Sequence, residues 1–249
     1  TVRVSPERVD RDRLRRAARP VERELDALVV AGVEEAFLVA GVETADEERP
    51  PWGPGRTETV RFDPSDGLVL RLEAFTPADG ASVVLRAALA NETDAPVRVA
   101  LLSPLVVEGE GGQVSLGVPS AQWAVLREGQ HSWAPSGVRS LKDRDFPGSD
   151  ADPSEGGFVS DLLTMLATAE GDRGLLTGWT EAREMFGRVR VGRNADGAWL
   201  RAEAEADGIE VAAGETLTTE PLLVQFTESP HRCLEGYGDV LAHRMDSRR

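Results

Sequence analysis

The residues most able to move protons near neutral pH are three histidines, His131, His231 and His243. His131 lies in the polar loop Glu128–Gly137 beside Ser132, but adjacency in sequence does not deliver the geometry of a Ser–His–Asp triad. The other two histidines fall in a helical stretch, where we expect them on the surface. No carboxylate pair for glycoside hydrolysis can be picked out from spacing alone. The sequence therefore predicts no catalytic residue.

Motifs for phosphate, dinucleotide or zinc binding and for a nucleophile elbow are absent from the sequence. The segment Lys142–Gly157 is rich in carboxylates, which could suggest calcium, but it lacks the spacing of an EF-hand loop. We expect a solvated loop there. Cys233 is the one cysteine, so the chain can form neither an internal disulfide nor a cysteine metal cluster. We expect no metal and no cofactor.

Trp52 lies in a second distinctive loop, Glu47–Gly55, which reads EERPPWGPG. An aromatic side chain held in a rigid loop can serve as a platform for a ligand. The alternative is that Trp52 plugs the end of a β-sandwich. The sequence leaves both roles open.

Short alternating or apolar runs separated by Gly, Pro, Asn and Asp recur along the chain and are typical of an antiparallel β-sandwich. A hairpin is expected from Leu25–Val30 and Ala36–Val42, and Phe158–Ala169 fits either a helix or a strand. Further strands are expected at Thr57–Phe62, Leu68–Phe75, Ser82–Ala90, Val97–Val107, Val114–Val118, Gln122–Arg127, Gly174–Trp179, Met185–Val191, Trp199–Ala206 and Leu222–Phe226. The predicted fold is all-β: a large antiparallel β-sandwich that closes with Gly174–Ser229.

After this sandwich, Pro230–Met245 changes to a helical pattern that begins at Ser229-Pro230, a capping residue followed by a first-turn proline. Its three- and four-residue spacing is that of one helix face, and the residues on that face are His231, Leu234, Tyr237, Val240, Leu241 and Arg244. We therefore expect a sandwich domain over residues 1–229 and a short helix over residues 230–249.

Composition limits the classes of partner. The 249-residue chain has a net charge of −15, which argues against binding to nucleic acid. No apolar run approaches the roughly 20 residues of a membrane span, and no signal peptide is visible. Lys142 is the one lysine among many arginines, which is typical of a GC-rich genome. A bacterial, cytoplasmic protein is the simplest interpretation.

Two stretches resemble a known family. The loop EGQHSWAPSG is similar to a loop in the N-terminal domain of melibiase-type α-galactosidases and their raffinose-synthase-like relatives, in glycoside hydrolase clan D. It keeps Gly129, Ser132, Trp133 and Gly137, and it departs at Glu128 and at Gln130-His131. Gly174–Ser229 and the helix after it resemble the end of the same domain.

The resemblance implies a β-super-sandwich similar to galactose-mutarotase-like domains. In the family a (β/α)₈ barrel follows and carries two catalytic aspartates that hydrolyse α-galactosides with retention. None of these aspartates has a counterpart in this sequence, so residues 230–249 would be a connector toward a missing barrel. The resemblance makes Trp133 the first and Trp52 the second candidate to stack on a galactosyl ring, with Gln130 and His131 fixing its hydroxyls. A homo-oligomer would also be in keeping with the family.

Other functions stay open. The chain could be a free-standing carbohydrate-binding module or a structural protein. A mutarotase-type sugar epimerase would need a histidine and a carboxylate on the concave face of the sheet, and His131 is the one histidine remotely placed for that role.

Overall fold

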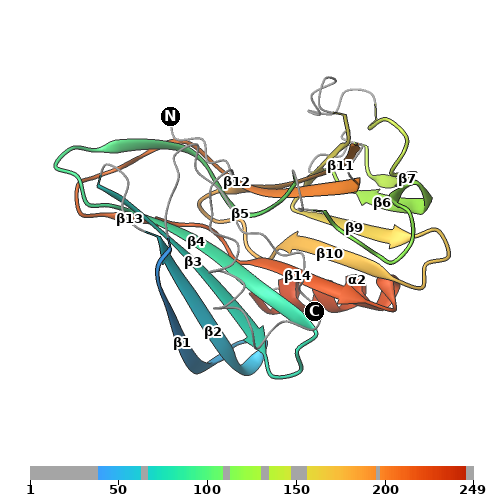
Figure 1. Ribbon diagram of the computed structural model, residues 1–249, viewed down its shortest axis with the longest axis horizontal. Coiled ribbons are helices and arrows are strands. Elements are labelled where there is room, and N and C mark those ends of the chain that lie inside the picture. Colours follow the sequence, from blue (N-terminus) through green and yellow to red (C-terminus); the bar gives the residue numbers. More distant parts are fainter. Residues whose placement is uncertain are drawn as a thin grey trace.

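The computed structural model describes residues 39–62, 67–108, 113–129, 135–146, 156–194 and 197–244. These residues form two antiparallel sheets and a C-terminal helix (Figure 1). The large sheet consists of β1 (Val39–Arg49), β2 (Gly53–Phe62), β3 (Leu68–Pro77), β4 (Ser82–Asn91), β14 (Leu222–Thr227), β10 (Gly174–Trp179), β9 (Leu163–Thr168), β6 (Trp123–Arg127) and β7 (Gly137–Ser140) in that order, with β13 (Thr216–Thr218) paired to β4. The small sheet has the order β5 (Val97–Val107), β12 (Gly197–Val211), β11 (Phe186–Asn194) and β8 (Phe158–Asp161). The prediction of a large antiparallel β-sandwich is confirmed.

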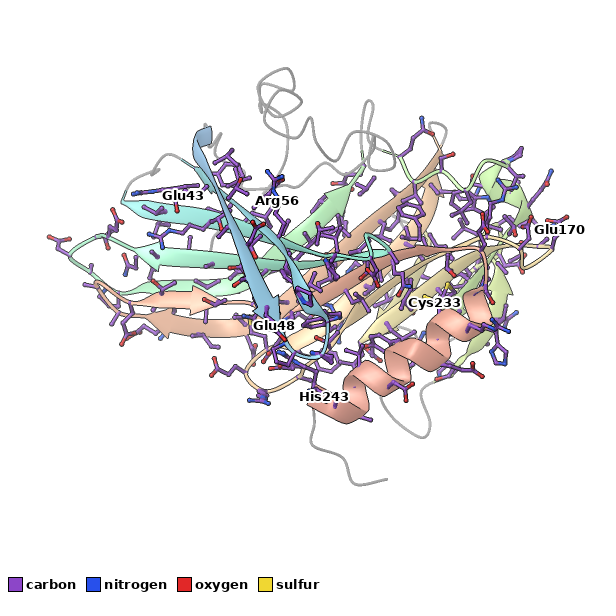
Figure 2. All side chains as sticks on the ribbon, turned by 90° about the horizontal axis from the view of Figure 1, so that it is seen from below. Glu43, Glu48, Arg56, Glu170, Cys233 and His243 are labelled. Carbon is purple, nitrogen blue, oxygen red and sulfur yellow. The ribbon has the colours of Figure 1, made fainter. Side chains whose placement is uncertain are left out.

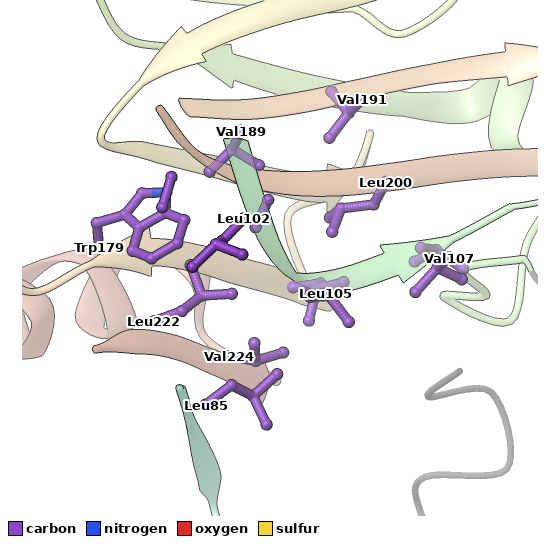
Figure 3. Close-up of a cluster of buried hydrophobic side chains, with 14 of the residues drawn as sticks. Leu85, Leu102, Leu105, Val107, Trp179, Val189, Val191, Leu200, Leu222 and Val224 are labelled. Atoms are coloured by element: carbon purple, nitrogen blue, oxygen red, sulfur yellow. The ribbon is translucent and has the colours of Figure 1, made fainter. Parts of the chain in front are cut away.

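The main core lies between the two sheets (Figure 3). Alternate residues of each strand face it, as the period of two requires. Leu85 and Leu222 enter it from the large sheet, and Leu105, Val189 and Leu200 enter it from the small sheet. In β11 and β12 the buried face is thus formed by the apolar residues Val189, Val191, Leu200 and Ala202.

Trp179 closes one end of this core, where it is almost fully buried. Its indole Nε1 donates a hydrogen bond of 3.2 Å to the carbonyl oxygen of Arg188. Gly187 lies against the ring, and a Cβ atom at that position would stand 2.4 Å from Trp179 Cγ. A residue without a side chain is therefore required where the small sheet approaches this tryptophan.

The helix α2 (Pro230–Arg244) packs on the outer face of the large sheet, against β10 and β14 (Figure 1). Cys233 and Tyr237 are its buried residues. They join a second apolar cluster that includes Phe75, Leu176 and Leu223. The predicted helix is confirmed, but its buried stripe is centred on Cys233 and Tyr237, whereas His231 is exposed.

Several local predictions differ from the structure. Glu47–Gly55 is not a loop for most of its length, because β1 runs to Arg49 and pairs with β2 from Gly53 onward. The charged residues hid the second part of β1, since an edge strand tolerates charged side chains. For Phe158–Ala169 the sequence left a helix and a strand open, and the structure has the strands β8 and β9. Val114–Val118 contributes a single bridge from Val114 to Ala198.

The expected hairpin Leu25–Val42 lies outside the described residues except at its end, where β1 begins at Val39. Two short strands, β7 and β13, were not predicted from the sequence. Three or four residues are too few to show an alternating pattern.

Candidate functional site

Three of the four predicted site residues, Gln130, His131 and Trp133, lie outside the described residues. Their roles therefore stay predictions. The structure does describe both ends of their loop, which connects β6 to β7. The geometry of the candidate site can therefore be described from the two ends of the loop and from the residues that bind these ends.

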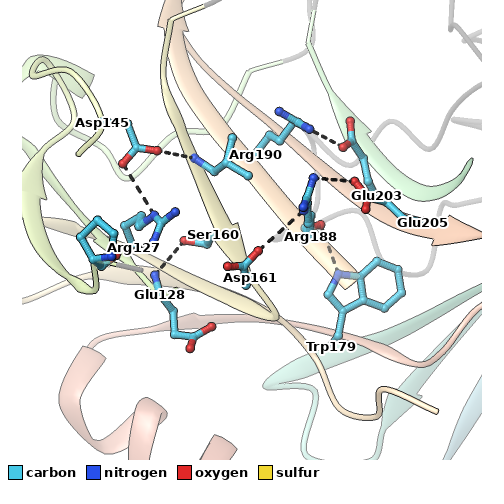
Figure 4. Close-up of polar contacts among 12 residues, drawn as sticks. Arg127, Glu128, Asp145, Ser160, Asp161, Trp179, Arg188, Arg190, Glu203 and Glu205 are labelled. Carbon is cyan, nitrogen blue, oxygen red and sulfur yellow. Dashed lines mark hydrogen bonds and ion pairs between the residues drawn. The ribbon is translucent and has the colours of Figure 1, made fainter. Parts of the chain in front are cut away.

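Arg127, the last residue of β6, clamps the two ends of the loop (Figure 4). Its side chain is directed into the space between the sheets, where it donates a hydrogen bond to the carbonyl oxygen of Pro135. The amide of Gly129 donates a hydrogen bond of 2.9 Å to Ser136 Oγ. The loop thus leaves and re-enters the sheet at a fixed point.

Asp145 neutralises the buried arginine. Its Oδ1 lies 3.7 Å from Arg127 Nε, and the two side chains are 4% and 5% exposed. The carboxylate also accepts hydrogen bonds from the amides of Phe146 at 2.7 Å and of Val159 at 3.1 Å. Asp145 is therefore a buried structural residue, and the prediction that Lys142–Gly157 is solvated is wrong at this position.

The base of the loop is tied to both sheets. Asp145 reaches β8 of the small sheet through Val159, and the amide of Glu128 donates a hydrogen bond of 3.1 Å to Ser160 Oγ on the same strand (Figure 4). Such links restrict the loop ends in position and direction. This arrangement suits a loop that must present side chains to a ligand or to another domain.

Glu128 has the most perturbed carboxyl group near the loop. Burial and the neighbouring Asp161 raise its pKa, while Arg127 opposes the shift. Its Oε2 atom is buried and has no hydrogen-bond partner among the described residues. Burial thus disfavours the charged form of this carboxyl group relative to that of an exposed glutamate. Sequence reasoning treated Glu128 only as a departure from the family pattern and missed this environment.

The outer face of the small sheet carries ion pairs across its strands (Figure 4). Arg188 lies 2.8 Å from Glu205 and 3.6 Å from Asp161, and Arg190 lies 2.6 Å from Glu203. Glu203 is only 8% exposed. These side chains pair with one another across the strands more than they face solvent.

Trp52 lies in the turn between β1 and β2, against the C-terminal end of α2. The guanidinium carbon of Arg244 is 5.3 Å from the centre of its ring, and Arg244 Nη1 donates a hydrogen bond of 3.3 Å to the carbonyl oxygen of Pro50. Burial, and then the neighbouring Arg86, lower the pKa of Arg244. Trp52 thus packs against the helix, and its role as a ligand platform stays a prediction.

Within the described ranges, no group of three or more His, Cys, Asp or Glu residues could hold a metal ion. His231 and His243 are exposed on α2. Burial raises the pKa of the Cys233 thiol to about 11, which leaves it a poor nucleophile at neutral pH. The helix segments that the structure describes are too short or too polar to cross a bilayer.

No family model matches the sequence, and no curated protein matches it. Solved structures do resemble the fold. The α-galactosidase of Lactobacillus brevis superposes with a TM-score of 0.57 and 11% identity over 84% of this chain and 29% of that protein. The GH36 α-galactosidase AgaA of Geobacillus stearothermophilus, in complex with stachyose, gives a TM-score of 0.60 and 8% identity over 84% and 30%.

A putative aldose 1-epimerase of Klebsiella pneumoniae also matches, with a TM-score of 0.50 and 12% identity over 84% of this chain and 60% of that protein. At such identities the likeness is one of fold. The chain spans about 30% of the length of the α-galactosidases that it matches. The resemblance noted in the sequence is therefore confirmed by structure: this chain has the fold of one part of the GH36 α-galactosidases.

Proposed function

We propose that this chain is the N-terminal, non-catalytic β-super-sandwich domain of an α-galactosidase-related glycoside hydrolase. The observation that carries the proposal is the one-sided match in length, in which 80–84% of this chain superposes on only about 30% of each α-galactosidase. The remainder of such an enzyme would include a (β/α)₈ barrel. Residues 1–229 would form the supporting sandwich, and residues 230–249 would lead toward that barrel.

In this proposal the catalytic groups lie in the barrel. Retaining hydrolysis uses two carboxyl groups about 5 Å apart, and a barrel supplies them at the ends of its strands. The sandwich contributes the loop that Arg127 and Asp145 hold at its base. Trp133 would then reach the rim of the galactoside site with Gln130 and His131 beside it, and Trp52 is the second candidate.

An activity assay tests the proposal. We expect the purified 249-residue chain to leave an aryl α-galactoside intact. We also expect the reading frame to continue beyond Arg249 into a barrel with two strand-end aspartates. Hydrolysis by the chain alone, with a rate that follows the protein through purification, would refute the non-catalytic role. A reading frame that stops at Arg249 would refute the role as part of a longer hydrolase.

A sugar epimerase is the second candidate, because the fold also resembles the putative aldose 1-epimerase of K. pneumoniae. Its acid–base pair would have to use His131, since His231 and His243 lie exposed on α2. Polarimetry with freshly dissolved α-galactose measures this activity. Epimerisation that is lost in His131→Asn would establish it, and a rate no faster than buffer would exclude it.

A free-standing carbohydrate-binding module is distinguished by calorimetry with galactose, melibiose and raffinose. Binding that disappears in Trp133→Ala would support the module, and the absence of heat at millimolar sugar would reject it. We place the protein in the bacterial cytoplasm, a compartment in which its one cysteine, Cys233, would stay reduced. Homo-oligomers are compatible with this role.

A further inference from the structure

A cluster of arginines lies on the outer face of the large sheet, beside the end of α2. Figure 2 shows the end of β1, marked by Glu48, next to the end of the helix, marked by His243. Arg244 ends the helix and lies over Trp52. Arg86 is on β4, on the same face of the sheet as Val84 of the second apolar cluster.

The carboxylates of this region are already engaged. Arg49 Nη2 lies 2.5 Å from Glu47, and Arg49 Nη1 lies 2.7 Å from Glu73, the residue directly opposite Arg86 in the sheet. Glu47 also accepts a hydrogen bond from Thr57. Arg86 is left with no hydrogen bond or ion pair to any residue that the structure describes, and Glu47, which it attracts electrostatically, is already bound by Arg49 and Thr57.

Arg244 is only partly satisfied. It pairs with Glu181 through Nη2 and reaches Pro50 through Nη1. Glu181 is shared, because Arg183 Nε lies 3.5 Å from its other oxygen. Arg86 and Arg244 are close enough to interact unfavourably as like charges.

Three buried N–H donors of these side chains have no acceptor among the described residues. They are Arg86 Nε, Arg244 Nε and Trp52 Nε1. A buried donor without an acceptor is costly, and it is rare in native proteins. All three atoms can only donate, so the group that satisfies them must be an acceptor. Two guanidinium groups select an oxyanion, which accepts several hydrogen bonds and relieves their repulsion.

We propose that Arg86, Arg244 and Trp52 form a binding site for an oxyanion, the carboxylate or phosphate group of a small ligand. The site lies on the sheet face beside α2 and uses no residue of the loop Glu128–Gly137. It does not depend on the presence of a barrel or on hydrolysis.

Calorimetry of the full chain at constant ionic strength tests the site, with inorganic phosphate and galacturonate as probes and galactose as the uncharged control. We expect at least one anion to bind and galactose to give no heat that depends on Arg86. Binding of phosphate alone identifies a free phosphate group as the ligand chemistry. Binding of galacturonate alone identifies a carboxylate carried on a sugar.

Arg86→Gln should weaken the binding of the anion by about tenfold or more, because a charge-assisted hydrogen bond is lost. Arg71→Gln is the matched control, since Arg71 is exposed on the same face and its loss changes the net charge equally. If Arg86→Gln fails to fold, Arg86→Lys is the second variant. It keeps the charge but removes the planar guanidinium group with its paired N–H donors, so it should also weaken binding. The site is overturned if neither anion binds, or if the Arg86 variant and the control bind alike.

Discussion

At the scale of single residues, one close contact fixes the helix α2 on the sheet. The hydroxyl of Tyr237 donates a hydrogen bond of 2.5 Å to the carbonyl oxygen of Trp179, and its ring lies on Gly178. Burial is the main reason that the pKa of Tyr237 is raised. The phenol is therefore a neutral donor at any physiological pH, and the fit depends on the absence of a side chain at residue 178.

Gly178→Ala should destabilise the chain, because the new Cβ atom would stand 2.7 Å from Tyr237 Cε2. Overpacking of this kind costs about 1–3 kcal/mol, measurable as a lower midpoint of urea unfolding. Gly236→Ala is the control: residue 236 lies within α2 with nothing within 4 Å. There alanine should stabilise by about 0.5–1 kcal/mol. Similar effects of both substitutions would show that Tyr237 does not need this contact.

At the scale of elements, the sequence could predict strands and helices that have a clear local pattern, but it could not predict how the strands pair. The strands β11 and β12 and the helix α2 were predicted because their apolar residues repeat with a clear period. Only the start of the strand β1 was predicted, within Ala36–Val42, because four of its last five residues are charged and edge strands tolerate such residues. Which strands become neighbours depends on long-range contacts that no short pattern contains.

The same limit applies to the candidate site. The loop Glu128–Gly137 stood out through its composition, whereas the buried pair beneath it did not. Arg127 ends a strand and Asp145 falls in a polar stretch, so each alone is typical of a surface residue. The two meet only because β7 pairs with β6 and the chain that follows β7 brings Asp145 back to Arg127.

Asp145→Asn should weaken the contacts that hold the base of the loop Glu128–Gly137. The substitution leaves Arg127 buried without its counter-charge and weakens the hydrogen bonds to Phe146 and Val159. We expect a loss of about 1.5–3 kcal/mol in the free energy of unfolding. This is less than for a short buried pair, because Nε and Oδ1 are 3.7 Å apart.

Glu210→Gln breaks the exposed pair between Arg98 and Glu210, whose side chains are 78% and 58% exposed. It should change the free energy of unfolding by less than about 0.5 kcal/mol. If Asp145→Asn proves as mild as this control in urea unfolding, the pair does not hold the loop.

At the scale of the whole molecule, one core joins the two sheets, and this arrangement determines how the chain unfolds. The small sheet has its buried residues in the same cluster as those of the large sheet, from Leu85 and Leu166 to Leu105 and Leu200. Neither sheet can expose its inner face without exposing the other. We therefore expect the two sheets to unfold together.

Leu200→Ala tests this coupling from the small sheet. Leu200 is fully buried, and the loss of its side chain should cost about 2–5 kcal/mol. Urea unfolding followed by tryptophan fluorescence and by far-UV circular dichroism should give coincident curves, both shifted to lower urea. Val138→Ala is the control, because Val138 is 67% exposed and its truncation should leave the midpoint nearly unchanged. Two separate transitions in the wild type, with only one shifted by Leu200→Ala, would show that the sheets are independent.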